Sequence, residues 1–402
     1  MLRETLSPSR RADAVEYAIR DVVAKAEEVS RSGKKIIHLN IGDPVKYGFD
    51  TPLHIKQAMK RAIDDGSNYY SPSEGLKELR KAVAEKENTL NHARIDQGDV
   101  LITQGISEAI LFLMGAMLNP GDEVLVPGPC YPPYITYAKF FDGVPIAYRT
   151  VEEHGWAPDI SDLEKKITAR TRLVVLTNPS NPTGSVYTRQ ELARIVEIAA
   201  RHNLPIAADE IYDRIILEDE FTSVASVAGE TPILGLNGFS KAYMMTGWRL
   251  GYMYTQDPTG KLRHVWEAIG KMSRVRLCAS TPTQVAGIAA LTGPQSHIGE
   301  MVKKLRQRRD FALKRIERIP RLAAARPKGA FYVFPKVDLR GTWKDDSQFA
   351  TQLLEETGVL VVHGSGFDPT YGKDHFRCVF LPEESLLSEA FDAIEKFVKR
   401  HP

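Results

Sequence analysis

The sequence has few cysteines, almost no net charge and no long uncharged apolar run. Its three cysteines are an odd, widely spaced set, which predicts free thiols in the reducing cytoplasm rather than a disulfide framework. Lys and Arg number 53 against 51 Asp and Glu, so no overall charge attracts nucleic acid or anionic lipid. No apolar run approaches the ~18 residues of a membrane span. We therefore expect neither a nucleic-acid partner nor a membrane.

Several motifs that mark common classes of site are also missing. Neither GxGxxG nor GxxxxGK[ST] occurs, which counts against a dinucleotide site or a P-loop. The ten histidines include no pair at a metal-ligand spacing such as HxxxH, so no metal is expected. The opening residues include basic side chains but no apolar core after them, so a secretory signal is not expected.

What the sequence does contain, from about residue 98, is an alternation of apolar runs and helical segments. The runs are typical of buried strands and cover residues 100–103, 123–127, 173–177, 205–208, 233–236 and 251–254. Helices are expected at 107–118 and 188–203, with lengths that suit crossovers between parallel strands. The pattern predicts an α/β fold with a large, mostly parallel sheet covered by helices.

The chain is longer than one ordinary core requires, and its character changes after residue 293. Residues 303–321 hold nine Lys and Arg and two acids, but their apolar positions share one face. That favours a helix with a solvated basic side over a nucleic-acid patch. We expect a large domain over residues 49–295 and a smaller, discontinuous α+β domain made of residues 1–48 and 296–402.

Polar residues follow several of the expected strands, where open α/β sheets bind their ligands. Ser107 opens a helix whose N-terminal N–H groups suit a phosphate, although by itself it is more readily a helix cap. Asn181 lies in the loop NPSNPTG, and Tyr212 in DEIY. Asp209 ends an apolar run, where an ionised carboxylate is costly unless a cation meets it.

The segment NGFSKAYMMTGWRLG, residues 237–251, places Lys241 among small and apolar residues. Such surroundings disfavour the charged amine and free it for attack on a carbonyl. Arg249 follows between Gly247 and Gly251, which let backbone and guanidinium close on a flat or charged ligand. In isolation Lys241 would be taken for a surface lysine, so its interpretation depends on the accompanying motifs.

Together, NPSNPTG, DEIY and SKxxxxTGWRLG, in this order and spacing, resemble the class I aminotransferases of the fold-type-I pyridoxal-phosphate group. The resemblance covers residues 42–377. It implies pyridoxal phosphate as the cofactor, bonded to Lys241, which also moves the proton between substrate and cofactor. Asp209 would pair with the ring nitrogen, and Tyr212 and Asn181 would bond the ring oxygen.

The resemblance implies further contacts to the cofactor. Those to its phosphate and ring would come from Gly105, Ile106, Ser107, Tyr131, Ser240 and Arg249. Gly238 stands where many members have Ser or Thr, so Ser240 is the candidate to replace that phosphate donor. Tyr70 would reach the phosphate from a second subunit, which implies a homodimer.

The substrate is implied by a finer resemblance. NGFSKAY and the opening EYAIRD…HLNIGDPVKYGFD look like the alanine-aminotransferase branch, which moves an amino group between L-alanine and 2-oxoglutarate. Arg377 would bind the α-carboxylate, Gly42 would line the same pocket and Tyr17 would close over the substrate. Arg274 and Arg276 are candidates for a distal carboxylate, although a structural salt bridge suits either of them better.

Three other functions fit part of the pattern. All the cofactor residues would be kept in an aspartate or aromatic aminotransferase and in a cysteine-sulfur β-lyase. Only product analysis would therefore distinguish these enzymes from an alanine aminotransferase. A regulator that uses this fold as a ligand sensor would need an added DNA-binding module. The short N-terminal segment leaves no room for one.

Overall fold

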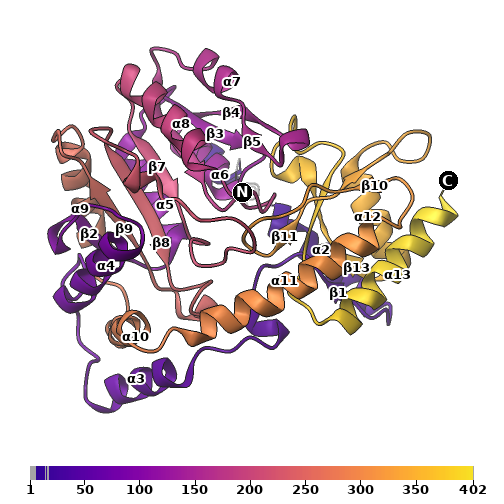
Figure 1. The fold of residues 1–402 in the computed structure, drawn as a ribbon, viewed down its shortest axis with the longest axis horizontal. Coiled ribbons are helices and arrows are strands. Elements are labelled where there is room, and N and C mark those ends of the chain that lie inside the picture. The colour runs from indigo at the N-terminus through magenta and orange to yellow at the C-terminus, as the bar shows by residue number, and fades with distance from the viewer. Residues whose placement is uncertain (1–5, 14, 16–17, 402) are drawn as a thin grey trace, which may run out of the picture.

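The computed structural model describes residues 6–13, 15 and 18–401, and its centre is an eight-stranded sheet (Figure 1). The strand order is β2-β9-β8-β7-β6-β3-β4-β5. In chain order the strands are β2 (Val100–Thr103), β3 (Glu123–Gly128), β4 (Val144–Val151), β5 (Ala157–Pro158), β6 (Thr171–Thr177), β7 (Ile206–Asp209), β8 (Ile233–Gly238) and β9 (Gly251–Gln256). The sheet is parallel from β8 to β4, whereas β9 runs antiparallel to both neighbours. The expected mostly parallel sheet is confirmed.

The strands are buried on both faces. Successive side chains point to opposite faces of the sheet, and helices cover each face. Leu101, Val124 and Val126 pack on one face, with α5 (Ile106–Met117), α6 (Pro132–Phe140) and α9 (Arg263–Arg276). Val100 and Leu125 pack on the other. The helices over that second face are α4 (Lys77–Leu90), α7 (Ile160–Lys165), α8 (Arg189–Arg201) and α10 (Thr281–Thr292). Helix α3 (Leu53–Asp64) packs on α10.

Both ends of the chain build a second core beside the sheet (Figure 1). Strand β1 (Ile37–His38) pairs in parallel with β13 (Val359–Leu360). Its other strands are β10 (Leu322–Ala323), β11 (Tyr332–Val333), β12 (Lys336–Val337), β14 (Val362–His363) and β15 (Phe376–Val379). Its helices are α2 (Ala18–Arg31), α11 (Ser296–Ile316), α12 (Asp346–Thr357) and α13 (Glu384–Arg400), and the short α1 (Arg10–Asp13) precedes them. The domain boundaries after residues 48 and 295 stay a prediction.

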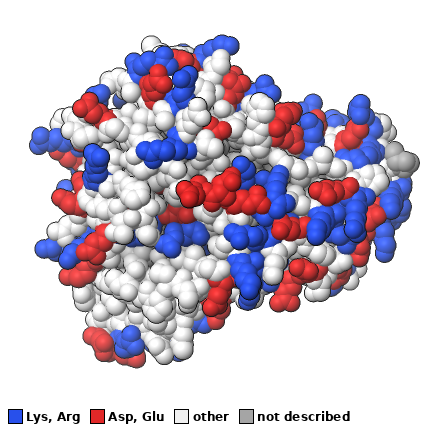
Figure 2. All heavy atoms as spheres, viewed as in Figure 1, with Lys and Arg blue, Asp and Glu red and all other residues white. Residues whose placement is uncertain are grey.

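The basic helix is less solvated than its pattern predicts. Arg309 on α11 is 1% exposed and pairs with Glu218 at 2.8 Å, and Arg308 is also buried. The predicted helix is α11, and most of its basic residues are exposed, but these two guanidiniums lie inside the protein. On the face drawn in Figure 2, charges of both signs are interspersed. Over residues 6–13, 15 and 18–401, no helix combines the length and apolar character needed to cross a membrane.

Candidate active site

The sheet brings the polar strand ends to one edge. Thr177 pairs with Asp209 across β6 and β7, and Gly238 pairs with Gly251 across β8 and β9. Gly251 also pairs with Thr103, which ends β2, because β9 runs against both neighbours. At this edge lies a cavity of about 520 Å³. Its lining residues are Ile19, Ile41, Gly42, Asp43, Ile106, Ser107, Tyr131, Thr177, Pro179, Asn181, Asp209, Ile211, Tyr212, Ser240, Lys241, Thr246, Gly247, Arg249, Tyr332 and Arg377.

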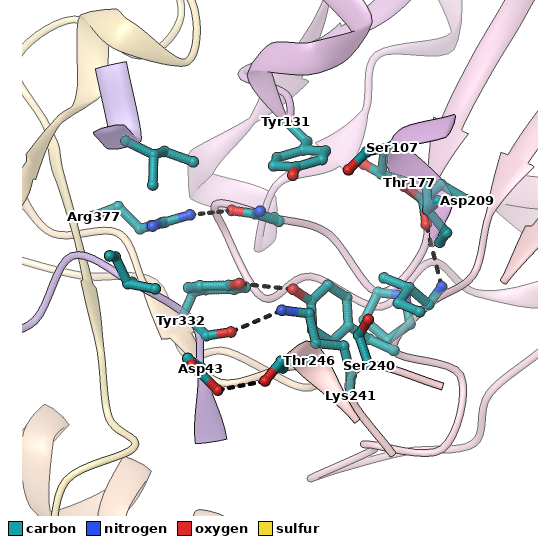
Figure 3. A pocket seen from close by; sticks show the side chains of 18 of the residues that line it. Asp43, Ser107, Tyr131, Thr177, Asp209, Ser240, Lys241, Thr246, Tyr332 and Arg377 are labelled. Atoms are coloured by element: carbon teal, nitrogen blue, oxygen red, sulfur yellow. Dashed lines mark hydrogen bonds between the residues drawn. The ribbon is translucent and has the colours of Figure 1, made fainter. Parts of the chain in front are cut away.

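Lys241 reaches into this cavity from the segment after β8 (Figure 3). Its Nζ donates to the Gly42 carbonyl at 2.7 Å and lies over the rings of Phe331 and Tyr212, 5.5 and 5.9 Å from their centroids. Burial lowers the pKa of Lys241 from 10.5 to about 8, although the Asp43 carboxylate opposes the shift. A much larger fraction of this amine than of an ordinary lysine is therefore neutral near neutral pH and able to attack a carbonyl.

Asp209 lies at the end of β7, 5% exposed, and its carboxylate accepts from the Tyr134 hydroxyl at 2.9 Å and the Ile211 amide at 3.2 Å. Burial raises the pKa of Asp209 to about 6, while the two hydrogen bonds lower it. The carboxylate thus lines the cavity with neutral donors around it, and a cationic ligand group would stabilise its ionised form.

A phosphate-sized anion would find donors at the start of α5. Ile106 is the first residue of that helix, so the N–H groups of its first turn have no partner within the helix. Arg249 lies beside it and donates to the Thr246 carbonyl at 2.9 Å. A side chain at Gly105, where φ is +77°, would collide with the Arg249 guanidinium, so this position requires glycine.

Gly238 is a packing residue. A Cβ placed there would lie 2.9 Å from the Gly251 Cα and 3.1 Å from the Leu250 carbonyl oxygen. The two strands approach too closely at this point for a serine without a backbone shift. Ser240 lines the cavity two residues on, which agrees with its expected place but leaves its donor role a prediction.

Arg377 on β15 is a second buried cation and is 1% exposed. In Figure 3 it lies on the side of the cavity opposite Asp209. Its Nη1 donates to Asn181 Oδ1 at 2.8 Å, and its Nη2 donates to the Asn40 carbonyl. Its Nε is buried without a hydrogen-bond partner among the described residues. The ring of Tyr332 lies 4.5 Å from the guanidinium carbon. No carboxylate pairs with Arg377 in the described chain, so it remains available to an anionic ligand.

Gly42 and Tyr212 join these groups through Tyr332. The Tyr212 and Tyr332 hydroxyls lie 2.7 Å apart, and a side chain at Gly42 would collide with that of Tyr332. Gly42 therefore lines the cavity as expected, and the close approach of Tyr332 and Phe331 disfavours any larger residue there.

Comparisons with known proteins agree with this arrangement. The family model described as aminotransferase class I and II matches residues 34–394. The chain is 37% identical to the glutamate-pyruvate aminotransferase AlaA of Escherichia coli, covering 98% of each chain. A solved alanine aminotransferase of Pyrococcus furiosus superposes with a TM-score of 0.96 at 50% identity, covering 98% of this chain and 100% of its own. The chain belongs to the class I and II aminotransferases.

The aspartate aminotransferase of Thermus thermophilus, solved with maleate, is also similar, with a TM-score of 0.89 at 34% identity over 98% of this chain and 100% of its own. The expected family, fold and enzyme class are confirmed. The cofactor is pyridoxal phosphate, and the substrates of the aminotransferase are amino acids and 2-oxo acids.

The residues of the cavity fit that cofactor. A buried carboxylate that lacks a cation, Asp209, suits a protonated ring nitrogen, and the amine of Lys241 suits the aldehyde. The start of α5 with Arg249 suits the phosphate. The cavity volume also lies within the usual range for small-ligand sites, about 300–1,000 Å³.

Three expected residues lie elsewhere, and a fourth cannot be placed because it is outside the described part of the chain. Tyr70 is 81% exposed and does not line the cavity of its own chain, and Tyr17 lies outside the described residues. Arg276 pairs with Glu108 at 2.6 Å, the structural salt bridge that suited it better. Arg274 is exposed and does not line the cavity either.

Sequence reasoning missed several residues of the aminotransferase site. Tyr134 is three residues after Tyr131 in PGPCYPPY, and the first turn of α6 turns it toward Asp209. Tyr332 was only a strand residue in the pattern. Asp43 lies in the NIGDP turn and accepts from the Thr246 hydroxyl at 2.8 Å. The turn motif was a signal for Asp43, whereas no pattern in the sequence marked Tyr332.

Proposed function

We propose that the aminotransferase moves the amino group reversibly between L-alanine and 2-oxoglutarate. The observation that carries the proposal is the full-length similarity to relatives named for alanine or for glutamate and pyruvate. Transfer from glutamate to pyruvate is the same reaction run backwards, so the two names agree. The geometry of the cavity supports the reaction class through one lysine, one buried acid and one buried arginine.

Lys241 and Asp209 are the proposed centre of the chemistry. Bound pyridoxal phosphate supplies a ring that accepts the electrons released when the substrate loses its Cα proton. The Nζ of Lys241 would bond the cofactor at rest and would carry that proton from Cα to C4′ during turnover. Asp209 would hold a proton on the ring nitrogen, which favours electron flow into the ring.

The other lining residues would bind and orient. We propose that the phosphate is held by Gly105, Ile106, Ser107, Ser240 and Arg249, and that Tyr131 stacks on the ring. Tyr212 and the amide nitrogen of Asn181 would donate to the ring oxygen, because Asn181 Oδ1 already accepts from Arg377. Arg377 would bind the substrate α-carboxylate beside Gly42, contributing about 1.5–3 kcal/mol through charged hydrogen bonds.

Binding of the distal carboxylate of 2-oxoglutarate needs further donors. Among the described residues, the cations that line the cavity are Lys241, Arg249 and Arg377, and each already has a proposed role. Neither Arg274 nor Arg276 lines the cavity, so donors other than these two would meet the distal carboxylate in a single chain. Discrimination among small side chains would then rest on pocket volume, which is worth only about 1–3 kcal/mol per methylene.

A panel of amino donors with 2-oxoglutarate tests the substrate assignment. We expect the kcat/KM of alanine to exceed that of aspartate and of aromatic donors by about tenfold or more, with weaker activity on other small amino acids. Arg377→Lys serves as the control, because losing the forked contact should lower kcat/KM for every donor alike. A higher kcat/KM for aspartate, the substrate named for the Thermus relative, would exclude alanine and leave the enzyme class intact.

Release of ammonia and thiol from cysteine conjugates, faster than transfer from any donor, would instead indicate the β-lyase. That outcome would contradict transamination as the main activity, although the cofactor roles would stand. Product analysis is needed because both reactions begin with the same bound groups.

We further propose a homodimer in which Tyr70 reaches the phosphate in the partner's site. Several large apolar side chains are exposed in the single chain, which supports a subunit interface, namely Leu53, Ile63, Tyr69, Val275 and Leu277. Figure 2 shows a surface poor in charged side chains around α10. Large exposed apolar residues are typical of subunit contacts.

Tyr70→Ala should lower cofactor affinity about 10- to 100-fold, because one charged hydrogen bond is lost. Mixing this variant with Lys241→Ala at limiting cofactor should restore activity, since each hybrid dimer has one site with both residues. Leu90→Ala, at an exposed apolar residue outside that group, is the control and should bind cofactor normally. Hybrids that form, by native mass spectrometry, without regaining activity would rule out the crossing of Tyr70.

The remaining proposals concern organisation and location. We propose that residues 1–48 and 296–402 form one domain beside residues 49–295, which limited proteolysis should reveal as cuts near the two boundaries. The three cysteines are unpaired, which supports a reducing compartment, and we propose the cytoplasm. Fractionation that finds the protein mainly outside the cytoplasm would contradict this.

A further inference from the structure

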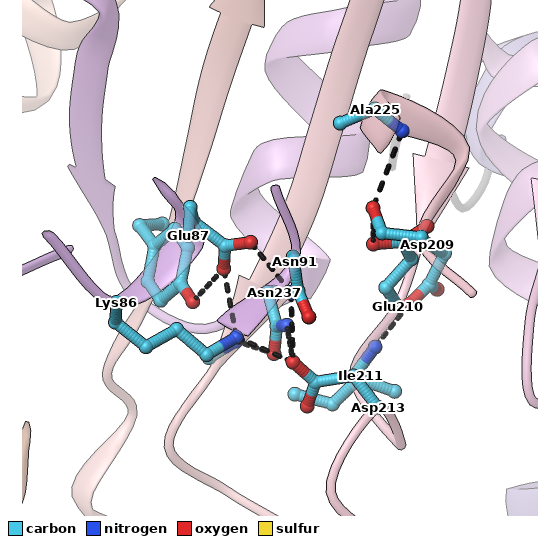
Figure 4. Close-up of polar contacts among 12 residues, drawn as sticks. Lys86, Glu87, Asn91, Asp209, Glu210, Ile211, Asp213, Ala225 and Asn237 are labelled. Atoms are coloured by element: carbon cyan, nitrogen blue, oxygen red, sulfur yellow. Dashed lines mark hydrogen bonds and ion pairs between the residues drawn. The ribbon is translucent and has the colours of Figure 1, made fainter. Parts of the chain in front are cut away.

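Behind the cavity lies a group of charged and amide side chains that the reaction does not use directly (Figure 4). We call it the buried ionic cluster. It consists of Lys86, Glu87, Asn91, Asp213 and Asn237. The Lys86 side chain is 7% exposed and those of Glu87 and Asp213 are 0% and 2%. None of the five lines the cavity.

One carboxylate oxygen is the centre of the cluster. Asp213 Oδ2 accepts from Lys86 Nζ, from Asn91 Nδ2 at 3.1 Å and from Asn237 Nδ2 at 3.0 Å. In Figure 4 these contacts converge on Asp213 from separate elements. Lys86 and Asn91 belong to α4 and its C-terminal cap, Asn237 belongs to β8, and Asp213 ends the turn after β7.

Lys86 is the one cation among the five described residues of the cluster, and it contacts both of their carboxylates. Its Nζ also lies 2.8 Å from Glu87, which accepts from Asn91 Nδ2 at 2.6 Å and from the Tyr252 hydroxyl at 2.5 Å. Burial lowers the pKa of Lys86, but Asp213 and Glu87 raise it more, so it lies above its usual value. Lys86 is therefore charged at neutral pH and compensates both acids.

The cluster touches both segments that carry the proposed chemistry. The Asp213 amide donates to the Glu210 carbonyl at 2.9 Å, which closes the turn directly after Asp209. Asn237 Oδ1 accepts from the Gly238 amide at 2.7 Å, three residues before Lys241. Close contact of Gly238 with Gly251 leaves this segment little freedom. The hydrogen bond from Asn237 to Asp213 thus links the Lys241 segment to the turn after Asp209, and Lys86 neutralises the Asp213 carboxylate that accepts it.

We propose that Lys86 and Asn237 are positioning residues, which hold the Lys241 segment in register with the Asp209 turn. This inference rests on the proposed roles of those two residues. Replacement of a buried ion pair by apolar residues is often neutral for stability, so stability alone is a weak reason to keep one. Geometry is a stronger reason, because a misplacement of about 1 Å far from the reacting atoms can lower a rate about 100-fold.

The decisive variants are Asn237→Ala, which cuts the link to Gly238 without changing charge, and Lys86→Met, which removes the cation. Each should bind cofactor and lower kcat about 10- to 100-fold, with KM within about threefold. The double variant should be little worse than the poorer single one, because both act through Asp213. Lys81→Met, an exposed lysine on the same helix, is the matched control and should leave kcat unchanged.

A second readout uses the chain without cofactor. Backbone hydrogen exchange at Gly238 and across residues 209–213 should be faster in Asn237→Ala and Lys86→Met than in wild type or Lys81→Met. This measurement does not depend on turnover, so it tests the link even if the proposed function fails. Failure of the proposed function would appear separately, as a wild-type protein that moves no amino group.

The positioning role is overturned if both variants keep kcat within twofold of wild type and unchanged exchange at these amides. Variants that lower the melting temperature alone would show that the cluster is only structural. If Lys86→Met does not fold, Asn237→Ala decides by the same two measurements, since it leaves Lys86 and both carboxylates in place.

Discussion

Replacing Lys241 with alanine is expected to stop turnover while the chain stays folded and still holds the cofactor. The lysine is half-buried, and the contacts of its Nζ are the Gly42 carbonyl and two aromatic rings, so few packing contacts depend on it. In the proposed role of Lys241, the loss would remove both the covalent attachment of the cofactor and the group that carries the Cα proton. A positioned acid–base group alone contributes about 10²–10⁴-fold, so we expect kcat to fall by at least about 10³-fold.

The attachment is measured directly by borohydride reduction of the yellow protein, followed by mass spectrometry of the peptides. One modified peptide containing Lys241 is the expected result, and Lys261→Ala, at an exposed lysine, should leave it unchanged. A cofactor fixed mainly to another lysine would contradict the assignment. Capture of the cofactor by the cofactor-free chain should rise with pH through a midpoint near 8, because the neutral amine is the reactive form.

Much of the site was predictable because an apolar run marks a buried strand, and the polar residue that follows it marks the end of that strand. Asp209 and Lys241 each follow an apolar run that folded as expected, β7 and β8, and their shared edge follows from the sheet. The order of NPSNPTG, DEIY and the lysine segment then indicated the aminotransferase family. The fold was predictable for the same reason, since β6, β7 and β8 are almost wholly buried.

Other features depend on contacts between segments far apart in the chain. Strand β4 was missed because its residues alternate in exposure near the sheet edge, unlike the buried runs. Tyr332 meets Tyr212 across 120 positions, and Arg309 is buried by Glu218 and the Pro327 carbonyl. The local sequence around a residue does not predict partners that lie so far away in the chain. The need for glycine at Gly238 likewise comes from Gly251 on the neighbouring strand.

Asp209→Asn is the second change with a large expected effect, because a neutral amide loses the charge that holds a proton on the ring nitrogen. The amide nearly matches the carboxylate in size. Its oxygen can still accept from the Ile211 amide, and its NH2 can donate to the Tyr134 hydroxyl oxygen, so the fold should persist. We expect kcat to fall about 100-fold or more, as when other preorganised charges are removed. Asp219→Asn, at an exposed carboxylate before β8, should leave kcat unchanged.

Tyr134→Phe tests whether activity depends on the ionised form of Asp209, because it keeps the carboxyl group and changes only its pKa. The Tyr134 hydrogen bond lowers the pKa of Asp209 against the effect of burial, so its loss should raise that pKa above the present value of about 6. A raised pKa leaves more of the carboxyl protonated at neutral pH, and the activity of this variant should therefore recover as pH increases. Asp209→Asn has no such group to titrate and should show no recovery. If the Asn variant kept kcat within tenfold of wild type, or recovered with pH as Tyr134→Phe does, Asp209 would not be the partner of the ring nitrogen.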